Sequence, residues 1–177
     1  MAQLIKTGAK GEQVTSLQNN LKKLGFELDA DGHFGPATKD AVEELQAIFG
    51  YNVDGIVGDA TLKLIEQQAG LGFNVTAPDA ITRGLQAQGK AQGEGPTAGR
   101  LLKKGTEGGD VRYLQRKLVA LGYTNIQIDG KFGKGTEDAV RALQQAFNYN
   151  VDGDVGEATN KLIYQQLGYG WRADKVA

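Results

Sequence analysis

The chain carries one pattern twice. Residues 4–73 match residues 101–171, with Leu4 aligned to Leu101 and Asp31 to Asp129, so the second copy has one extra residue near Thr124–Ile128. A repeat of this kind indicates units that fold alike. Each copy has about 70 residues, near the lower limit for an independent core. We therefore predict a first domain at 1–73, a connecting segment at 74–99 and a second domain at 100–177.

Apolar residues recur every three or four positions in three stretches of each copy, a spacing that predicts helices with one apolar face. The first stretch ends at Gly25 in one copy and at Gly122 in the other, where a left-handed residue commonly closes a helix. The stretches of the first copy contain Val14, Leu17, Leu21 and Leu24, then Ala41, Val42, Leu45 and Phe49, then Leu64 and Ile65. The predicted fold class is all-α, with two tandem three-helix domains.

A shorter motif is nested inside the repeat. Asp-Gly-x-[Phe/Val]-Gly-x-x-Thr occurs at residues 31–38, 54–61, 129–136 and 152–159, which we call the helix-entry loops. Asp-Gly favours a turn, and the Thr is expected in the first helical turn, bonded to free backbone groups. Phe34 and Phe132 are expected to be core residues. The motif is thus interpreted mainly as the architecture of helix starts.

The ordered set of these motifs resembles the peptidoglycan-binding domain family, the small three-helix modules attached to many bacterial and phage cell-wall hydrolases. The matching elements in the first copy are Leu24-Gly25-Phe26, Asp31-Gly32-His33-Phe34-Gly35, Thr38, Ala41, Val42, Leu45, Gln46, Asp54-Gly55-Ile56-Val57-Gly58 and Thr61. The second copy repeats them from Leu121-Gly122-Tyr123 to Thr159. The resemblance implies a non-catalytic wall-binding module, here without the usual hydrolase companion.

The segment between the copies is rich in Gly, Ala and Gln. Thr76–Leu85 is compatible with a short helix, and residues 86–99 have the composition of a flexible linker. A flexible chain across residues 74–99 would span on the order of 28 Å. The two domains are therefore expected to reach neighbouring sites on one surface.

Nucleophilic catalysis and catalytic zinc need residues that the chain scarcely has. It contains no Cys, and Ser16 and His33 are its sole Ser and His. The other copy has Tyr113 and Lys131 at these two positions, so a shared Ser–His site is excluded. One His is too few for a zinc centre.

Calcium binding and glycoside hydrolysis find little more support. The acidic run at residues 27–32 resembles a calcium loop, but Thr38 stands where its bidentate Glu belongs. The loop acids shared by both copies all precede Gly, as turn formers do, and a small helical unit offers no long cleft. We therefore predict no catalytic residue, metal or cofactor, and a chain that is not an enzyme.

Charge and hydropathy exclude other partners. The 20 basic and 21 acidic residues form no basic stripe, so nucleic acid and membrane are not expected partners. No apolar run approaches the roughly 20 residues of a membrane span, and the first residues lack the apolar core of a secretory signal. The expected location is the cell wall, periplasm or extracellular space by a route not visible in the sequence, or a phage or injection particle.

Binding of peptidoglycan calls for an aromatic platform and amide groups in a shallow groove. The candidates recur around the second helix-entry loop of each copy: Gln46, Tyr51, Asn52 and Asp54, and Gln144, Tyr149, Asn150 and Asp152. Gln18 and Gln115 recur on the first helix. Two alternatives stay open: the Tyr rings cap the core, and the Gln side chains cap loop backbone. Trp171, the single Trp, either packs in its own core or stacks on a ligand.

These features predict non-catalytic, bivalent binding of bacterial peptidoglycan, through its glycan or its stem peptide. Two weak sites on one chain gain roughly 10²–10⁴ in avidity when both engage. A second hypothesis is a structural or docking component of a larger assembly, such as a phage tail or a contractile injection machine. A third is an accessory of a lytic enzyme whose catalytic chain is separate, so a hydrolase or assembly proteins are further candidate partners.

Overall fold

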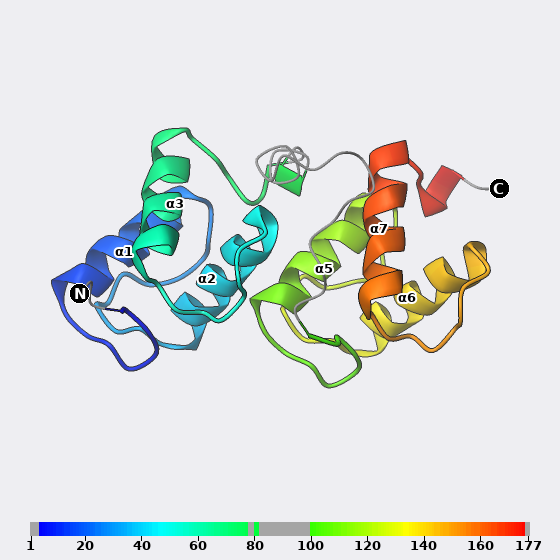
Figure 1. The fold of residues 1–177 in the computed structure, drawn as a ribbon, viewed down its shortest axis with the longest axis horizontal. Coiled ribbons are helices and arrows are strands. Elements are labelled where there is room, and N and C mark those ends of the chain that lie inside the picture. Colours follow the sequence, from blue (N-terminus) through cyan, green and yellow to red (C-terminus); the bar gives the residue numbers. More distant parts are fainter. Residues whose placement is uncertain (1–3, 78–79, 82–99, 176–177) are drawn as a thin grey trace. The chain divides into compact units, whose positions relative to one another are not determined.

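The computed structural model describes residues 4–77, 80–81 and 100–175 (Figure 1). The chain divides into two compact units, Met1–Gly84 and Leu85–Ala177, and each is described by itself. The predicted flexible linker at 86–99 lies outside the described residues, as does most of the predicted short helix at 76–85.

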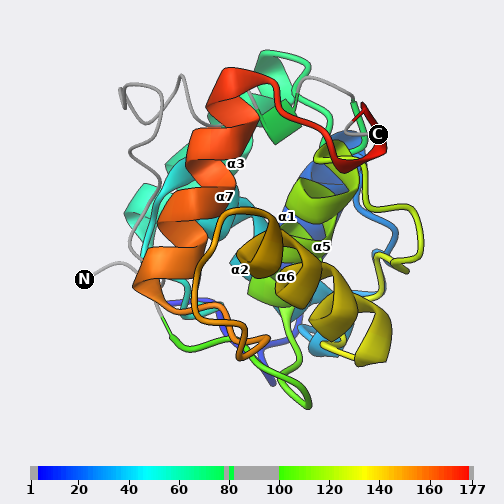
Figure 2. The ribbon, with the colours of Figure 1, turned by 90° about the vertical axis from the view of Figure 1, so that its right-hand side faces the viewer.

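Each unit has three α-helices in its described part, which confirms the all-α prediction. The first unit contains α1 (Glu12–Lys23), α2 (Pro36–Phe49) and α3 (Asp59–Gly70). The second contains α5 (Gly109–Ala120), α6 (Lys134–Ala146) and α7 (Glu157–Tyr169), followed by the 3₁₀ turn η1 (Ala173–Lys175). Helix α1 contacts both α2 and α3, and α5 contacts both α6 and α7. Figure 2 shows α7 upright beside α5, with α6 drawn in front.

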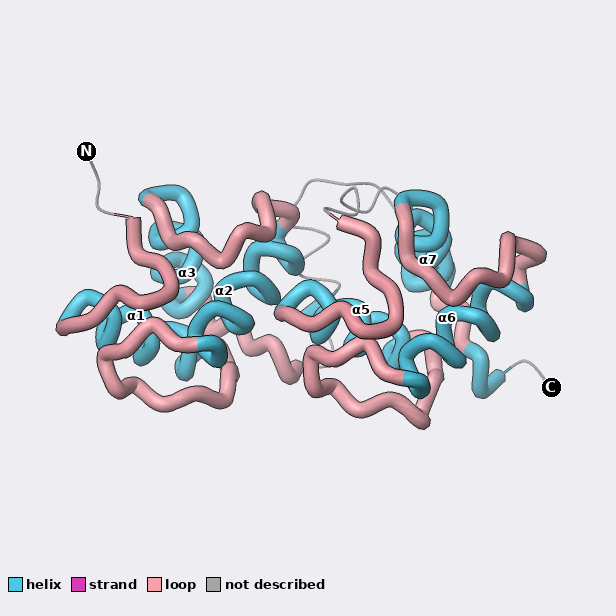
Figure 3. Tube along the Cα trace, turned by 90° about the horizontal axis from the view of Figure 1, so that it is seen from below, coloured by secondary structure: helices cyan, strands magenta, loops and turns pink. Residues whose placement is uncertain are grey.

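Irregular segments, coloured pink in Figure 3, precede the helices of each unit. In the described part of the chain, extended backbone pairs as isolated antiparallel bridges. These are Ile5–Val57 and Lys10–His33 in the first unit, and Leu102–Val155 and Glu107–Lys131 in the second. Each bridge joins the segment before the first helix of a unit to one of its helix-entry loops, so the start of each repeat belongs to the folded unit.

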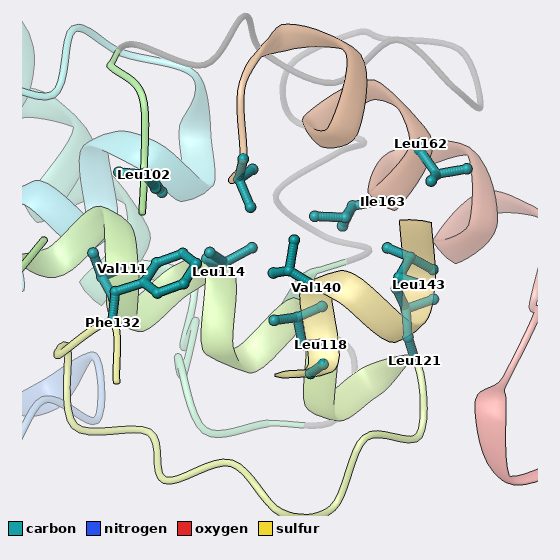
Figure 4. Close-up of a cluster of buried hydrophobic side chains, with 12 residues drawn as sticks. Leu102, Val111, Leu114, Leu118, Leu121, Phe132, Val140, Leu143, Leu162 and Ile163 are labelled. Atoms are coloured by element: carbon teal, nitrogen blue, oxygen red, sulfur yellow. The ribbon is translucent and has the colours of Figure 1, made fainter. Parts of the chain in front are cut away.

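The apolar faces predicted from sequence meet in one core per copy. In the second unit Leu118, Val140, Leu143 and Ile163 are fully buried and lie together between α5, α6 and α7 (Figure 4). Burial of each such side chain is worth about 1.5–3 kcal/mol. Phe34 and Phe132 are 2% exposed, which confirms the prediction that both are core residues.

The residues after the third helix close the core. Trp171 packs edge-on against Phe147 at 5.0 Å between ring centroids, and Phe73 packs on Phe49 in the same way at 5.1 Å in the first unit. Of the two interpretations of Trp171, the structure thus shows core packing. Since it is the single Trp, its fluorescence reports on the second unit alone.

Candidate functional site

A buried glutamine holds the second helix-entry loop of the second unit. The side-chain nitrogen of Gln144 donates to Asp152 Oδ1 at 2.8 Å, to the carbonyl oxygen of Asp154 at 3.1 Å and to Thr159 Oγ1 at 3.1 Å. Its oxygen accepts from the backbone N–H of Gly153 at 2.9 Å. Gly153 has φ 78°, a conformation that glycine adopts without strain. Gln144 itself is 1% exposed. We call this set of bonds the glutamine clamp.

All four helix-entry loops carry the same clamp. In each, a Gln from the preceding helix bonds the Asp carboxylate, a loop carbonyl, the Thr hydroxyl and the Gly N–H. The sets are Gln18 with Asp31, His33, Thr38 and Gly32; Gln46 with Asp54, Ile56, Thr61 and Gly55; Gln115 with Asp129, Lys131, Thr136 and Gly130; and Gln144 as above. The Asp-Gly motif and the Gln are therefore one structural device.

The clamp corrects the role predicted for the threonines. The helices that follow these loops begin after Gly35, Gly58, Gly133 and Gly156, and none has a side-chain cap. Each motif Thr accepts a bond from the Gln amide instead of bonding a free backbone group. The motif thus anchors the loop to the preceding helix.

The candidate binding residues come together around the second helix-entry loop of each unit. Asn52 Nδ2 donates to Asp54 Oδ2 at 2.9 Å, and Asn150 does the same to Asp152 at 3.0 Å. The neighbouring Tyr51 is 39% exposed, and Tyr149 is 37% exposed. Gln46 lies beneath with its amide bonded to the loop, as Gln144 does. The Tyr and Asn side chains are therefore at the surface, each Asn is bonded to the Asp of its loop, and the Gln lies beneath that loop.

One recurring surface residue was missed by the sequence analysis. Leu4 is 57% exposed, and its Cδ2 lies 3.2 Å from the point that a Cβ on Gly58 would occupy. Leu101 is 50% exposed and lies over Gly156 in the same way. Both therefore cover the end of the second helix-entry loop. The signal was available, since each Leu starts its copy of the repeat.

The loop carboxylates are stabilised in their ionised form. Hydrogen bonds from the backbone N–H of Asp154 and the side-chain amide of Gln144 lower the pKa of Asp152. In the same way, the backbone N–H of His33 and the side-chain amide of Gln18 lower the pKa of Asp31. For Asp54 and Asp129, burial raises the pKa, but hydrogen bonds from backbone and Gln outweigh it, so the net pKa is lowered.

These shifts predict acid sensitivity. With folded pKa values below the ordinary 3.8, the unfolded chain binds more protons near pH 4. The carboxylates therefore stabilise the fold above about pH 4, and this contribution is lost as pH falls through their folded pKa values. Urea unfolding followed by Trp171 fluorescence should show a stable midpoint near neutral pH and a falling one below pH 4. Asp152→Asn should be less stable at pH 7 and show a shallower acid slope; an unchanged slope would contradict the assignment.

Two further findings concern the described residues alone. Within 4–77, 80–81 and 100–175, no three His, Cys, Asp or Glu residues are grouped so as to hold a metal ion. Over the same residues, no helix combines the length and the apolar character that crossing a membrane requires.

Comparison with known proteins gives consistent matches. The family model described as a putative peptidoglycan binding domain matches residues 10–65 and 107–163. The chain is 34% identical over 172 residues to the N-acetylmuramoyl-L-alanine amidase CwlL of Bacillus licheniformis. This match covers 90% of this chain and 45% of that protein. The chain is 42% identical over 66 residues to the zinc D-Ala-D-Ala carboxypeptidase of Streptomyces albus G, covering 36% of this chain and 26% of that protein.

Among solved structures, a peptidoglycan-binding protein from Clostridioides difficile in complex with glutamine hydroxamate matches with 30% identity and a TM-score of 0.38. The match covers 41% of this chain and 45% of that one. The chain spans less than half the length of the amidases that match most of it.

The amidases contradict one prediction. Two relatives that match 90% and 93% of the chain are named as N-acetylmuramoyl-L-alanine amidases, one of them as probable, so the prediction that the chain is not an enzyme is wrong as a general statement. The scarcity of nucleophiles and metal ligands is a property of these 177 residues, and the match covers only 45% of each amidase.

Proposed function

Since the chain belongs to the peptidoglycan-binding domain family, we propose that its two units bind one wall polymer together, each through its Tyr-Asn pair. The observation that carries the proposal is the recurrence of one surface arrangement. In both units an exposed Tyr adjoins an Asn that is held by a clamped Asp. The part of a surface that both copies keep is the natural candidate for a ligand that both copies share.

The chemistry of this surface suits a glycan or a short peptide. The Tyr ring offers an apolar face with a polar tip. The Asn amide offers hydrogen bonds, and the bond to Asp holds it in one orientation, so little conformational entropy is lost on binding. In this proposal Tyr51, Asn52, Tyr149 and Asn150 contact the ligand, whereas Gln46, Asp54, Gln144 and Asp152 position them.

We further propose that the chain serves a wall-lytic enzyme at the bacterial cell wall. Its resemblance to an amidase and to a carboxypeptidase supports this role. Two sites on one chain raise the local concentration of each site for the polymer, with a gain of roughly 10²–10⁴ over one site. Such binding would keep an attached activity close to its substrate.

A pull-down of the full chain on purified sacculi tests the proposal. We expect retention on sacculi and release by excess soluble peptidoglycan fragments. Cellulose particles serve as the control surface, since they present a glycan without N-acetyl groups or peptides. Equal retention on sacculi and cellulose, or none on either, would contradict peptidoglycan binding.

A further inference from the structure

The second unit contains a surface cavity of about 360 Å³. None of the residues that line it belongs to the loop at residues 149–152, which we call the Tyr149 loop. Three segments line it: the loop Gly122–Ile126 after α5, the first turns of α6 at Gly135 and Asp138, and the C-terminal turn at Ala173 and Asp174. All of them belong to the second unit. The volume lies at the lower end of the range typical of small-ligand sites.

The walls of the cavity are fixed by close backbone contacts. The N–H of Ala173 donates to the carbonyl oxygen of Leu121 at 2.8 Å, which ties the C-terminal turn to the end of α5. Gly122 has φ 92°, and a Cβ there would lie 2.6 Å from Asp174 Oδ1. A Cβ on Gly135 would lie 2.6 Å from the carbonyl oxygen of Asn125. Both glycines therefore let neighbouring segments approach closely at the edge of the cavity.

The charges at the cavity are already paired. Asp138 accepts two bonds from Lys134 Nζ at 2.9 and 2.8 Å. Asp174 accepts two bonds from Arg172 at 2.9 Å each. An ionised carboxylate only accepts hydrogen bonds, at about four lone-pair sites, so ligand hydroxyl groups are the donors that would bond here. Because both negative charges have local partners, the cavity favours a neutral polar ligand over a cation.

Tyr123 supplies the aromatic wall. Its ring is half-buried and lies 6.4 Å from the ring of Trp171, centroid to centroid, so the core fixes its position. Burial raises the pKa of Tyr123 to about 12, which keeps the phenol a neutral hydrogen-bond donor. An aromatic face beside carboxylate acceptors is a combination that suits a sugar ring.

The first copy keeps the frame of this cavity, since Asn74 Oδ1 lies over Gly25 as Asp174 Oδ1 lies over Gly122, but it lacks three of the residues. It has Phe26 at the position of Tyr123, Ala37 at that of Gly135 and Thr76 at that of Asp174. Phe26 is moreover buried in the core of its own unit. The phenol, the carboxylate and the small residue are thus properties of the second copy alone, although the surrounding fold is shared.

We propose that this cavity binds one sugar residue of a neutral N-acetylated glycan, stacked on the Tyr123 ring and hydrogen-bonded by the Tyr123 hydroxyl, Asp138 and Asp174. The proposal rests on the proposed function in taking wall glycan as the source of the sugar. It goes beyond that function because the site is a second one in the same unit. The two units would then be unequal, with the second gripping the glycan at an additional point.

An NMR titration of the ¹⁵N-labelled full chain with tri-N-acetylchitotriose tests the cavity. We expect amide shifts grouped at residues 122–126, Gly135 and Ala173. Tyr123→Phe should weaken binding roughly twofold to tenfold, the effect of losing one neutral hydrogen bond. Asp174→Thr should weaken it roughly tenfold or more, since a charged acceptor is lost. Both variants install the residue that the first copy carries, which favours correct folding.

Tyr169→Phe is the matched control, because this Tyr is 74% exposed and lies outside the cavity. It should leave the titration unchanged. Shifts confined to the Tyr149 loop, or a response only to a lysine-containing stem peptide, would overturn the cavity proposal. Absence of any cavity shift while sacculi still retain the chain would overturn it and leave the proposed function intact. Cavity shifts in a chain that sacculi do not retain would support the cavity and overturn the proposed function.

Discussion

Gln144→Ala is expected to leave the second unit largely unfolded at 37 °C. The change removes an amide whose two N–H groups are shared among three acceptors and whose oxygen accepts one bond, from a side chain that is 1% exposed. Each buried group left without a partner costs about 1–3 kcal/mol, and the vacated volume adds to this. A total loss of about 3–5 kcal/mol rivals the whole stability of a small domain.

The expected shift of the thermal midpoint is at least about 12 °C, from about 4 °C per kcal/mol in a domain of this size. Trp171 fluorescence during heating measures it for the second unit, because the first unit contains no Trp. Gln144→Met separates the two causes: it fills most of the volume without the hydrogen bonds, so it should recover only part of the loss.

Gln145→Ala is the matched control for this prediction. Gln145 is the next residue of α6, it is exposed, and it takes no part in the clamp. Its replacement should change stability by less than about 0.5 kcal/mol. If both variants melt together, the clamp contributes nothing beyond ordinary helix packing.

The helices and the core followed from the sequence because their cause is local. A spacing of three or four residues puts Leu114 and Leu118 on one face of a helix whatever lies opposite. The recurrence of the glutamines was equally visible, yet their partners were not. Gln115 bonds Thr136 across 21 positions, so the pattern alone left open whether the amide meets a ligand or the loop.

The cavity had no comparable signal. It depends on the one-residue insertion near Thr124–Ile128 and on the C-terminal turn, which places Asp174 over Gly122. Alignment of the two copies reveals the residues that they share. The cavity is lined partly by residues that differ between the copies, so the alignment did not indicate it. Leu4 and Leu101 mark the start of each copy in the sequence, but nothing in that alignment indicates that both side chains are exposed.

The largest effect on binding is expected from the two tyrosines together. Tyr51→Ala or Tyr149→Ala alone removes the aromatic platform of one unit, and central aromatic residues commonly account for about 2 kcal/mol or more of binding. Loss of one of two linked sites also removes the avidity gain, so either single variant should bind sacculi roughly 10²-fold or more weakly. The double variant should show no retention above the cellulose control.

Tyr169→Ala is the control, since Tyr169 is an exposed Tyr of α7 outside the helix-entry loops. Equilibrium binding to a dilution series of sacculi measures the affinity of the two single variants, the double variant and the control. The Trp171 fluorescence verifies that the second unit stays folded in each. Bivalent binding requires that the two single variants weaken retention to a similar extent. A large loss from Tyr149→Ala with none from Tyr51→Ala would show that one unit alone holds the wall. Full retention of the double variant would move the binding surface away from the Tyr-Asn pairs altogether.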